Sequence, residues 1–327
     1  MHMPSSEVNS DSKENTENYS ESSDDSGEDA DAKLRFFEKF HRTKTENTET
    51  DDNNDNPEKK PLEKYESDKL AVEKMIEENK TLNEISEDER KALINVGVEL
   101  AARKQEFDVT PEQIENVKES ITFVDVNHVM KEWNVSEDEA HYIQGYYSSD
   151  GKIKLNVDAV GNEVKEGLVT VSHEALNKLS QHYDENGNLI PGFTGLKRDD
   201  IEGRNVGMNE GVTRMYASRS TEEFTENREE TSYANEVEVM KEYENIVGAD
   251  ELFRAYKTGD TSFLSENMDS NIGMGVYDEL CNQMDEMQKC EENGDRRGVE
   301  KAKANVKNIL ESYQKAKGDR NDEQDID

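Results

Sequence analysis

The first 66 residues cannot form a packed core, so any fold must be built from the rest of the chain. They contain 19 acidic and 9 basic residues, and residues 20–31 are almost all Ser, Glu, Asp and Gly. Such a segment buries too little apolar surface to offset the conformational entropy that ordering would cost. We therefore expect residues 1–66 to be a disordered acidic tail.

Residues 32–42 interrupt this tail with an apolar pattern. The segment contains Phe36, and on a helix Leu34, Phe37 and Phe40 would share one face. The pattern predicts a short helix that docks on a protein partner through Phe36, Phe37 and Phe40. A transient helix without a partner fits the composition equally well.

Acidic residues are in excess beyond the tail as well. The whole chain has a net charge of −37, with 36% charged and 31% hydrophobic residues. Nucleic acid is not expected as a partner, because its phosphate backbone binds clustered Lys and Arg. Self-repulsion that favours solubility is the simplest explanation of the charge, and DNA mimicry or a basic protein partner are the alternatives.

The sequence also lacks the patterns of membrane insertion and of Sec-dependent secretion. No stretch has the apolar length of a membrane span, and residues 1–6 show no basic region followed by an apolar run. We therefore expect no membrane partner. The expected location is the cytoplasm, or outside the cell after export of an effector by a non-Sec secretion system.

Helical patterns with recognisable start signals follow the tail. Ser86 begins a capping box, and Thr110 precedes a proline that suits the first position of a helix. We expect a helical segment over residues 67–120. Towards the C-terminus, residues 276–317 are predicted to form an antiparallel helical hairpin, and residues 318–327 a second disordered tail.

The pattern between these segments changes from helical to strand-like and back. Residues 121–124 predict a strand, and residues 143–147 and 152–157 predict two strands around a tight turn. A helical pattern resumes from Gly161. The expected fold class is α+β and mainly helical, with a small sheet or hairpin ahead of the helix that carries His173.

Two short motifs on predicted helices point to chemistry. The first is HEALN, from His173 to Asn177, and the second is NEGVT, which contains Glu210. His173 and Asn177 share a helix face, because four residues advance a helix by only about 40° net. Glu210 follows His173 by 37 residues, with an intervening loop that allows the chain to turn back.

In this order the motifs resemble the HExxH helix and the later ligand helix of zincins of the Glu type, which are gluzincin-like zinc metallopeptidases. Similar Asn-Glu-Gly-x-Thr segments occur in bacterial zincin-like proteins. The resemblance covers roughly residues 121–271 and implies a zincin-like domain over residues 121–275. It implies zinc ligands at positions 173, 177 and 210, and Glu174 as the general base of peptide hydrolysis.

Asn177 departs from the zincin pattern, which has a second histidine at this position. An amide oxygen is a poor zinc ligand beside an imidazole, so we expect zinc binding to be weak or absent if Asn177 is native. Three explanations remain open. The chain is a natural pseudoenzyme, or it binds metal weakly or with unusual ligands, or it is a deliberately inactivated variant.

Three further side chains bear on the site. Tyr233 begins a predicted helix and is a candidate donor to a tetrahedral intermediate, with core packing as the alternative. Arg214 lies four residues after Glu210 and is a candidate to contact the transition state or a metal ligand; it could pair with Glu210 in competition with a metal. His182 falls on the far side of the helix from His173 and is expected to lie at the helix end.

Two functions of different classes follow. The first is a metallopeptidase domain that acts on a peptide or protein substrate, impaired by Asn177. The alternative is a catalytically inactive zincin-fold module that binds a protein partner. The sequence leaves open whether the chain is an enzyme.

Overall fold

The computed structural model describes residues 59–104, 107–148, 152–183, 189–193, 205–225 and 233–324. They lie in the larger of two units of the chain, residues 51–327. The expected helix over residues 32–42, with Phe36, Phe37 and Phe40, falls outside the described residues. No helix in the described part of the chain is long and apolar enough to cross a membrane.

Three helices precede the sheet, as the start signals predict. They are α2 (Lys59–Glu77), α3 (Glu87–Lys104) and α4 (Pro111–Ser120). Thr110 and Gln113 form a capping box at the start of α4. The expected boundary at residue 67 is wrong, because α2 already begins at Lys59. Burial of Tyr65, whose ring lies 4.1 Å from the Arg103 guanidinium of α3, explains the earlier start.

A small three-stranded sheet follows, with two short helices inserted in it. The elements are β1 (Ile121–Val124), α5 (Val126–Trp133), α6 (Glu137–Ala140), β2 (Gly145–Tyr147) and β3 (Ile153–Asn156). The strand order is β1-β3-β2, so β2 is an edge strand. The expected hairpin pairs β2 with β3 in antiparallel register, and β1 adds to β3 in parallel. The fold is thus mainly helical with a small sheet, as predicted.

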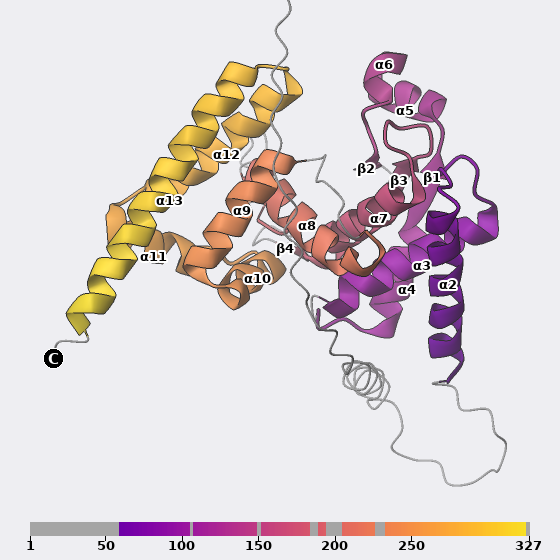
Figure 1. Ribbon diagram of the computed structural model, residues 1–327, viewed down its shortest axis with the longest axis horizontal. Helices are drawn as coiled ribbons and strands as arrows, with labels where there is room; N and C mark the ends of the chain where they lie inside the picture. The colour runs from indigo at the N-terminus through magenta and orange to yellow at the C-terminus, as the bar shows by residue number, and fades with distance from the viewer. Residues whose placement is uncertain are drawn as a thin grey trace, which may run out of the picture. The chain divides into compact units, whose positions relative to one another are not determined.

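The helix that carries His173 lies at the centre of the described residues. This helix, α7 (Val164–Leu179), contacts α3 on one side and α8 (Val206–Ser220) on the other (Figure 1). Nearly all of its residues are buried, including polar ones such as His173, Glu174 and Asn177. The strands β4 (Gln181–Tyr183) and β5 (Leu189–Pro191) pair in antiparallel register after α7. The expected helix-end position of His182 is wrong, because α7 ends at Leu179 and His182 is the middle residue of β4.

The remaining described elements are helical. They are η2 (Glu222–Phe224), α9 (Ala234–Val247), α10 (Ala249–Thr258), α11 (Ser262–Ile272), α12 (Val276–Glu292) and α13 (Arg296–Gln324). As expected, α12 and α13 form a helical hairpin (Figure 1). The expected tail from residue 318 is wrong, since α13 continues to Gln324. A single glycine such as Gly318 costs a helix only about 1 kcal/mol and does not end it.

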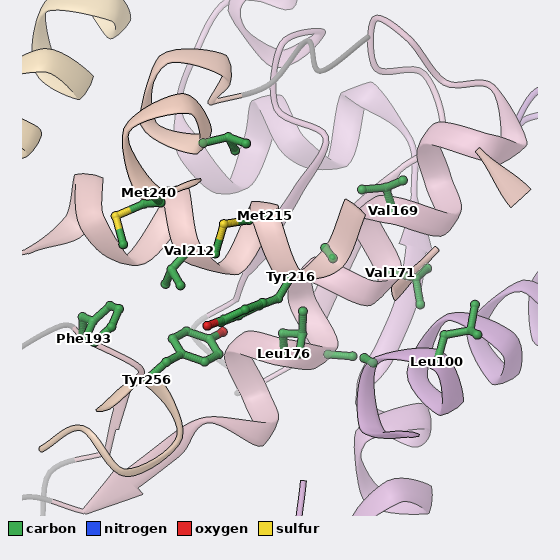
Figure 2. Packing of buried hydrophobic residues seen from close by; sticks show 14 of the residues in the cluster. Leu100, Val169, Val171, Leu176, Phe193, Val212, Met215, Tyr216, Met240 and Tyr256 are labelled. Atoms are coloured by element: carbon green, nitrogen blue, oxygen red, sulfur yellow. The ribbon is translucent and has the colours of Figure 1, made fainter. Parts of the chain in front are cut away.

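One hydrophobic core joins the three structured segments that the sequence separates. Its buried residues run from Tyr65 in α2 to Tyr313 in α13. Figure 2 shows Tyr216 and Tyr256 near its middle, where their rings lie 5.6 Å apart. The expected segments 67–120, 121–275 and 276–317 therefore share a core and are not independent domains. A second, small cluster around Val129 lies between α5, α6 and the sheet.

Candidate functional site

The candidate site is a cavity of about 860 Å³ beside α7. The edge strand β2, the helices α7 and α8, the start of α9 and the end of α12 contribute to its lining. All six side chains that the sequence selects line this cavity: His173, Glu174, Asn177, Glu210, Arg214 and Tyr233. The two motifs, 37 residues apart in the sequence, therefore meet at one site.

His173 and Glu210 are in direct contact in this cavity. Nε2 of His173 lies 3.1 Å from Oε2 of Glu210, and both side chains are largely buried. The other ring nitrogen of His173, Nδ1, is buried and has no hydrogen-bond partner among the described residues. The pair thus links α7 to α8 through the Nε2 edge of the imidazole ring.

Asn177 is held away from a ligand role by hydrogen bonds to α8. Its side-chain oxygen accepts from Nδ2 of Asn209 at 3.3 Å and from the hydroxyl of Thr213 at 3.2 Å. The orientation of Asn209 is fixed because its Oδ1 accepts from the backbone N–H of Phe193 at 3.1 Å. Asn209 must therefore present its amino group to Asn177, which in turn must present its oxygen.

This network continues from Asn177 into the core. Thr213 donates its only hydroxyl proton to Asn177, so at its 2.9 Å contact with Tyr256 it must accept from the tyrosine hydroxyl. The chain of bonds joins α7, α8 and α10 through buried side chains. Asn177 is thus an integral part of the packing between these helices.

Glu174 points into the cavity without a protein partner. Its side chain is about nine-tenths buried, and no described residue forms a hydrogen bond with its carboxyl group. Burial is the main cause that raises the pKa of Glu174 from 4.5 to about 7; His173 opposes this shift, and neighbouring Glu210 contributes to it. The carboxyl group can therefore take up or release a proton near neutral pH.

Arg214 pairs with a different carboxylate from the one expected. Its guanidinium donates to Oε1 of Glu166 in α7, and both side chains are buried. The expected pair between Arg214 and Glu210 is wrong, because Glu210 contacts His173 instead. Arg214 therefore neutralises Glu166 and does not compete for Glu210.

Tyr233 is the residue directly before α9, and its ring stacks on the imidazole of His173. The two rings are stacked, with centroids 6.0 Å apart and planes within 8°. The backbone of Tyr233 is left-handed, with φ of 57°, which is unusual for an aromatic residue. Glu210, then burial, raises the pKa of the Tyr233 hydroxyl well above its ordinary value, so this group remains a donor at neutral pH.

The rim of the cavity is formed by residues outside the two motifs. Trp133 and Tyr142, which are 50% and 77% exposed, line one side of it together with β2. Glu291 and Glu292, at the end of α12, contribute to another part of the lining. The only sequence signal for these rim residues was the adjacent pair Glu291 and Glu292. They lie at the end of a predicted helix that is C-terminal to both motifs.

The side chains at the site do not fit a catalytic zinc ion. Such an ion takes three protein ligands, and the histidines among them usually donate their second ring nitrogen to an acceptor. Here His173 and Glu210 supply two ligand atoms, the oxygen of Asn177 is committed to α8, and Nδ1 of His173 lacks an acceptor among the described residues. No group of three His, Cys, Asp or Glu side chains is placed to share an ion in that part of the chain.

Comparison with known proteins adds no family. No family model matches the chain, and neither a curated protein nor a solved structure matches it. The resemblance to zincins therefore rests on the two motifs and their order in the chain.

Proposed function

We propose that the chain carries a zincin-like domain that has lost its catalytic metal centre and binds a peptide segment of a partner protein in the cavity beside α7. The observation that carries the proposal is the pair of hydrogen bonds that Asn209 and Thr213 donate to the oxygen of Asn177. Through these hydrogen bonds Asn177, at the position of the second zinc ligand in zincins, helps to pack α7 against α8.

The zincin part of the proposal is supported by the arrangement around His173. A strand hairpin precedes the HEALN helix, and the later NEGVT helix brings Glu210 to 3.1 Å from His173. The edge strand β2 lies close by: a Cβ atom placed on Gly145 would be 3.2 Å from Oε1 of Glu174. A strand edge beside the motif helix offers backbone groups to an extended peptide.

The loss of metal binding follows from the cost of freeing Asn177. To turn its oxygen towards an ion beside His173, the side chain must leave Asn209 and Thr213. The buried amide of Asn209 would then lack an acceptor, at a cost of about 1–3 kcal/mol, and the hydroxyl of Thr213 would keep only its contact with Tyr256. An amide oxygen gains too little from zinc to offset this cost easily.

The cavity supports binding even without a metal. About 860 Å³ is enough for several peptide side chains, and the exposed aromatic rings on its rim offer apolar contact. Glu174 and Tyr233 remain available to a ligand as an acceptor and a donor. The domain would then act as an interaction module, the second of the two functions that the sequence suggests.

The experiment compares zinc binding and peptide hydrolysis in the wild type, Asn177→His and Asn177→His/Glu210→Ala. We expect no tight zinc binding by calorimetry in the wild type, and at least about a 100-fold gain in affinity in Asn177→His from the added imidazole. Most of this gain should disappear in the double variant. The wild type should leave a mixture of peptides intact when products are analysed by mass spectrometry.

A different outcome would identify an active zinc peptidase. Near-stoichiometric zinc in the wild type, with hydrolysis that Glu174→Gln abolishes, would overturn the proposal. Equal zinc affinities of the wild type and Asn177→His would show that positions 173, 177 and 210 do not form one ligand set, and would remove the zincin interpretation itself.

A further inference from the structure

The cavity beside α7 carries more negative charge than its own side chains neutralise. Four acidic side chains line it: Glu174 of α7, Glu210 of α8, and Glu291 and Glu292 of α12. Among its described lining residues, Arg214 is the single lysine or arginine, and it is paired with Glu166. The cavity therefore has no described lysine or arginine left to balance these four groups.

The contacts of the α12 carboxylates leave their charge in place. Glu291 accepts a hydrogen bond from the amide of Asn235, and Glu292 accepts one from Gln288 at 3.3 Å. Both donors are neutral. Glu174, about nine-tenths buried, lines the same cavity without any described hydrogen-bond partner. A buried carboxyl group of this kind gains from a donor or cation that a ligand brings.

Apolar and aromatic groups on the rim complement the carboxylates. Three of the large hydrophobic side chains that the described surface exposes line this cavity: Trp133, Tyr142 and Val160. The indole of Trp133 meets the ring of Tyr146 edge-on, with centroids 5.5 Å apart and planes at 89°. Exposed aromatic faces of this kind attract Lys and Arg side chains and pack on their alkyl stems.

From these charges and faces we infer that the ligand of the cavity is a basic segment of a partner protein. Its Lys or Arg side chains would bind between the aromatic rim and the carboxylates of Glu174, Glu291 and Glu292. The net charge of −37 acts in the same direction, because it attracts a cationic partner over long range. This inference rests on the proposed function, since it identifies the class of peptide that the same cavity binds.

Trp133 allows direct measurement of binding, because it is the only tryptophan in the chain. Its fluorescence is followed while synthetic ten-residue peptides, identical except for Lys/Arg, Gln or Glu at alternate positions, are added to the full chain at 0.15 M salt. The basic peptide should bind at least about tenfold more tightly than the Gln peptide. The Glu peptide should show no saturable signal.

Matched variants separate the contribution of the cavity carboxylates to peptide binding from that of the overall negative charge. Glu291→Gln/Glu292→Gln keeps the side-chain shapes and should weaken binding of the basic peptide about tenfold or more. Glu300→Gln/Glu311→Gln removes the same charge from exposed positions on α13 and should weaken binding less than about threefold. Equal effects of the two double variants, or equal binding of the basic and Gln peptides, would overturn the inference.

Two further outcomes separate an error in the ligand class from an error in the proposed function. If spermine displaces the basic peptide at matched charge concentration, the cavity collects small cations and the peptide assignment fails. If the wild type hydrolyses peptides, the metal-free part of the proposed function fails. The inference on the ligand then survives only if cleavage of basic peptides is selectively slowed by Glu291→Gln/Glu292→Gln.

Discussion

The side-chain oxygen of Asn177 accepts a hydrogen bond from the side-chain amide of Asn209, 3.3 Å away across the contact between α7 and α8. Asn209 is the residue immediately before Glu210, so one motif supplies the group that holds the other. The hydrogen bond thus joins the HEALN and NEGVT motifs where α7 packs against α8.

This contact predicts a measurable coupling. Asn177→Ala should lower the free energy of unfolding by about 1–3 kcal/mol, because it leaves the amide of Asn209 and the hydroxyl of Thr213 without their acceptor. Urea denaturation of Asn177→Ala, Asn209→Ala and the double variant should give a coupling energy of about 1 kcal/mol. Asn308→Ala, on the exposed face of α13, is the control and should stay within about 0.5 kcal/mol of the wild type. Strict additivity of the two buried substitutions would contradict the hydrogen bond.

The sequence predicted the elements better than the contacts between them. Helix starts such as Ser86 and Thr110 depend on residues within one turn, and the structure has capping boxes there. The meeting of His173 with Glu210 was predictable because two motifs selected these residues independently. Their surroundings were not, since the groups that hold Asn177 come from another helix.

Arg214 and α11 illustrate why local spacing fails. Spacing along α8 favoured Glu210 as the partner of Arg214, but tertiary packing supplies Glu166 from α7, 48 residues away. No helix was predicted over residues 262–272, where the structure has α11, because the apolar pattern there is weak: only Leu264 and Met268 are buried. Both results depend on which surfaces meet in three dimensions.

The buried pair of Arg214 and Glu166 yields a second prediction. Arg214→Met should destabilise the fold by about 3–5 kcal/mol, because a buried carboxylate loses its cation. Glu166→Gln added to Arg214→Met should restore at least about half of this loss, since the charge left behind is removed. Arg254→Met, in an exposed pair with Glu251, should cost no more than about 1 kcal/mol in the same urea titrations. A failure of Glu166→Gln to rescue stability would argue against the pair as the cause.

Gly211, the glycine of the NEGVT motif, lies where α8 and α9 approach too closely for a larger side chain. A Cβ atom at this position would lie 2.8 Å from Cβ of Glu236 and 2.9 Å from Cγ of Met240, both in α9. Gly211→Ala should therefore push α8 and α9 apart and destabilise the protein by about 1–3 kcal/mol, although alanine favours helix.

Gly318 is the matched control, because it lies within α13 and a Cβ atom there would meet nothing within 4 Å. Gly318→Ala should raise stability by up to about 1 kcal/mol. Thermal unfolding of the two alanine variants should thus shift in opposite directions. A stabilised Gly211→Ala would show that the close approach of α8 and α9 is not required.

Glu236 supplies a prediction about pH. This residue of α9 is fully buried, and neither carboxyl oxygen has a hydrogen-bond partner in another described residue. Burial raises the pKa of Glu236 from 4.5 to about 7, and the charges of Glu291 and Glu210 add to the shift while Lys303 opposes it. The folded protein therefore holds this proton at pH values where the unfolded chain has released it.

A raised carboxyl pKa makes stability fall as pH increases. The contribution is fully present below pH 4.5, declines through the interval up to about pH 7, and is constant above it. The total decline is roughly 3 kcal/mol, because each tenfold change in the acid dissociation constant corresponds to about 1.36 kcal/mol. Glu236→Gln cannot ionise, so its loss of stability between pH 5 and pH 8 should be smaller than that of the wild type by up to about this amount.

Urea denaturation of the wild type and Glu236→Gln at pH 5 and pH 8 measures this contribution. Comparing the two proteins cancels the change in stability that arises from general self-repulsion of the acidic chain. Glu238→Gln is the control on the same helix, because hydrogen bonds from Lys303 and Lys307 lower the pKa of Glu238. The Glu238 carboxylate is charged in the folded and the unfolded protein between pH 5 and pH 8, and the stability that it contributes is lost only at lower pH. Glu238→Gln should therefore show the same change in stability between pH 5 and pH 8 as the wild type. Glu236→Gln and the wild type could instead lose the same stability between pH 5 and pH 8. That result would show that Glu236 is not protonated in the folded protein at pH 5, and would contradict its burial without a hydrogen-bond partner.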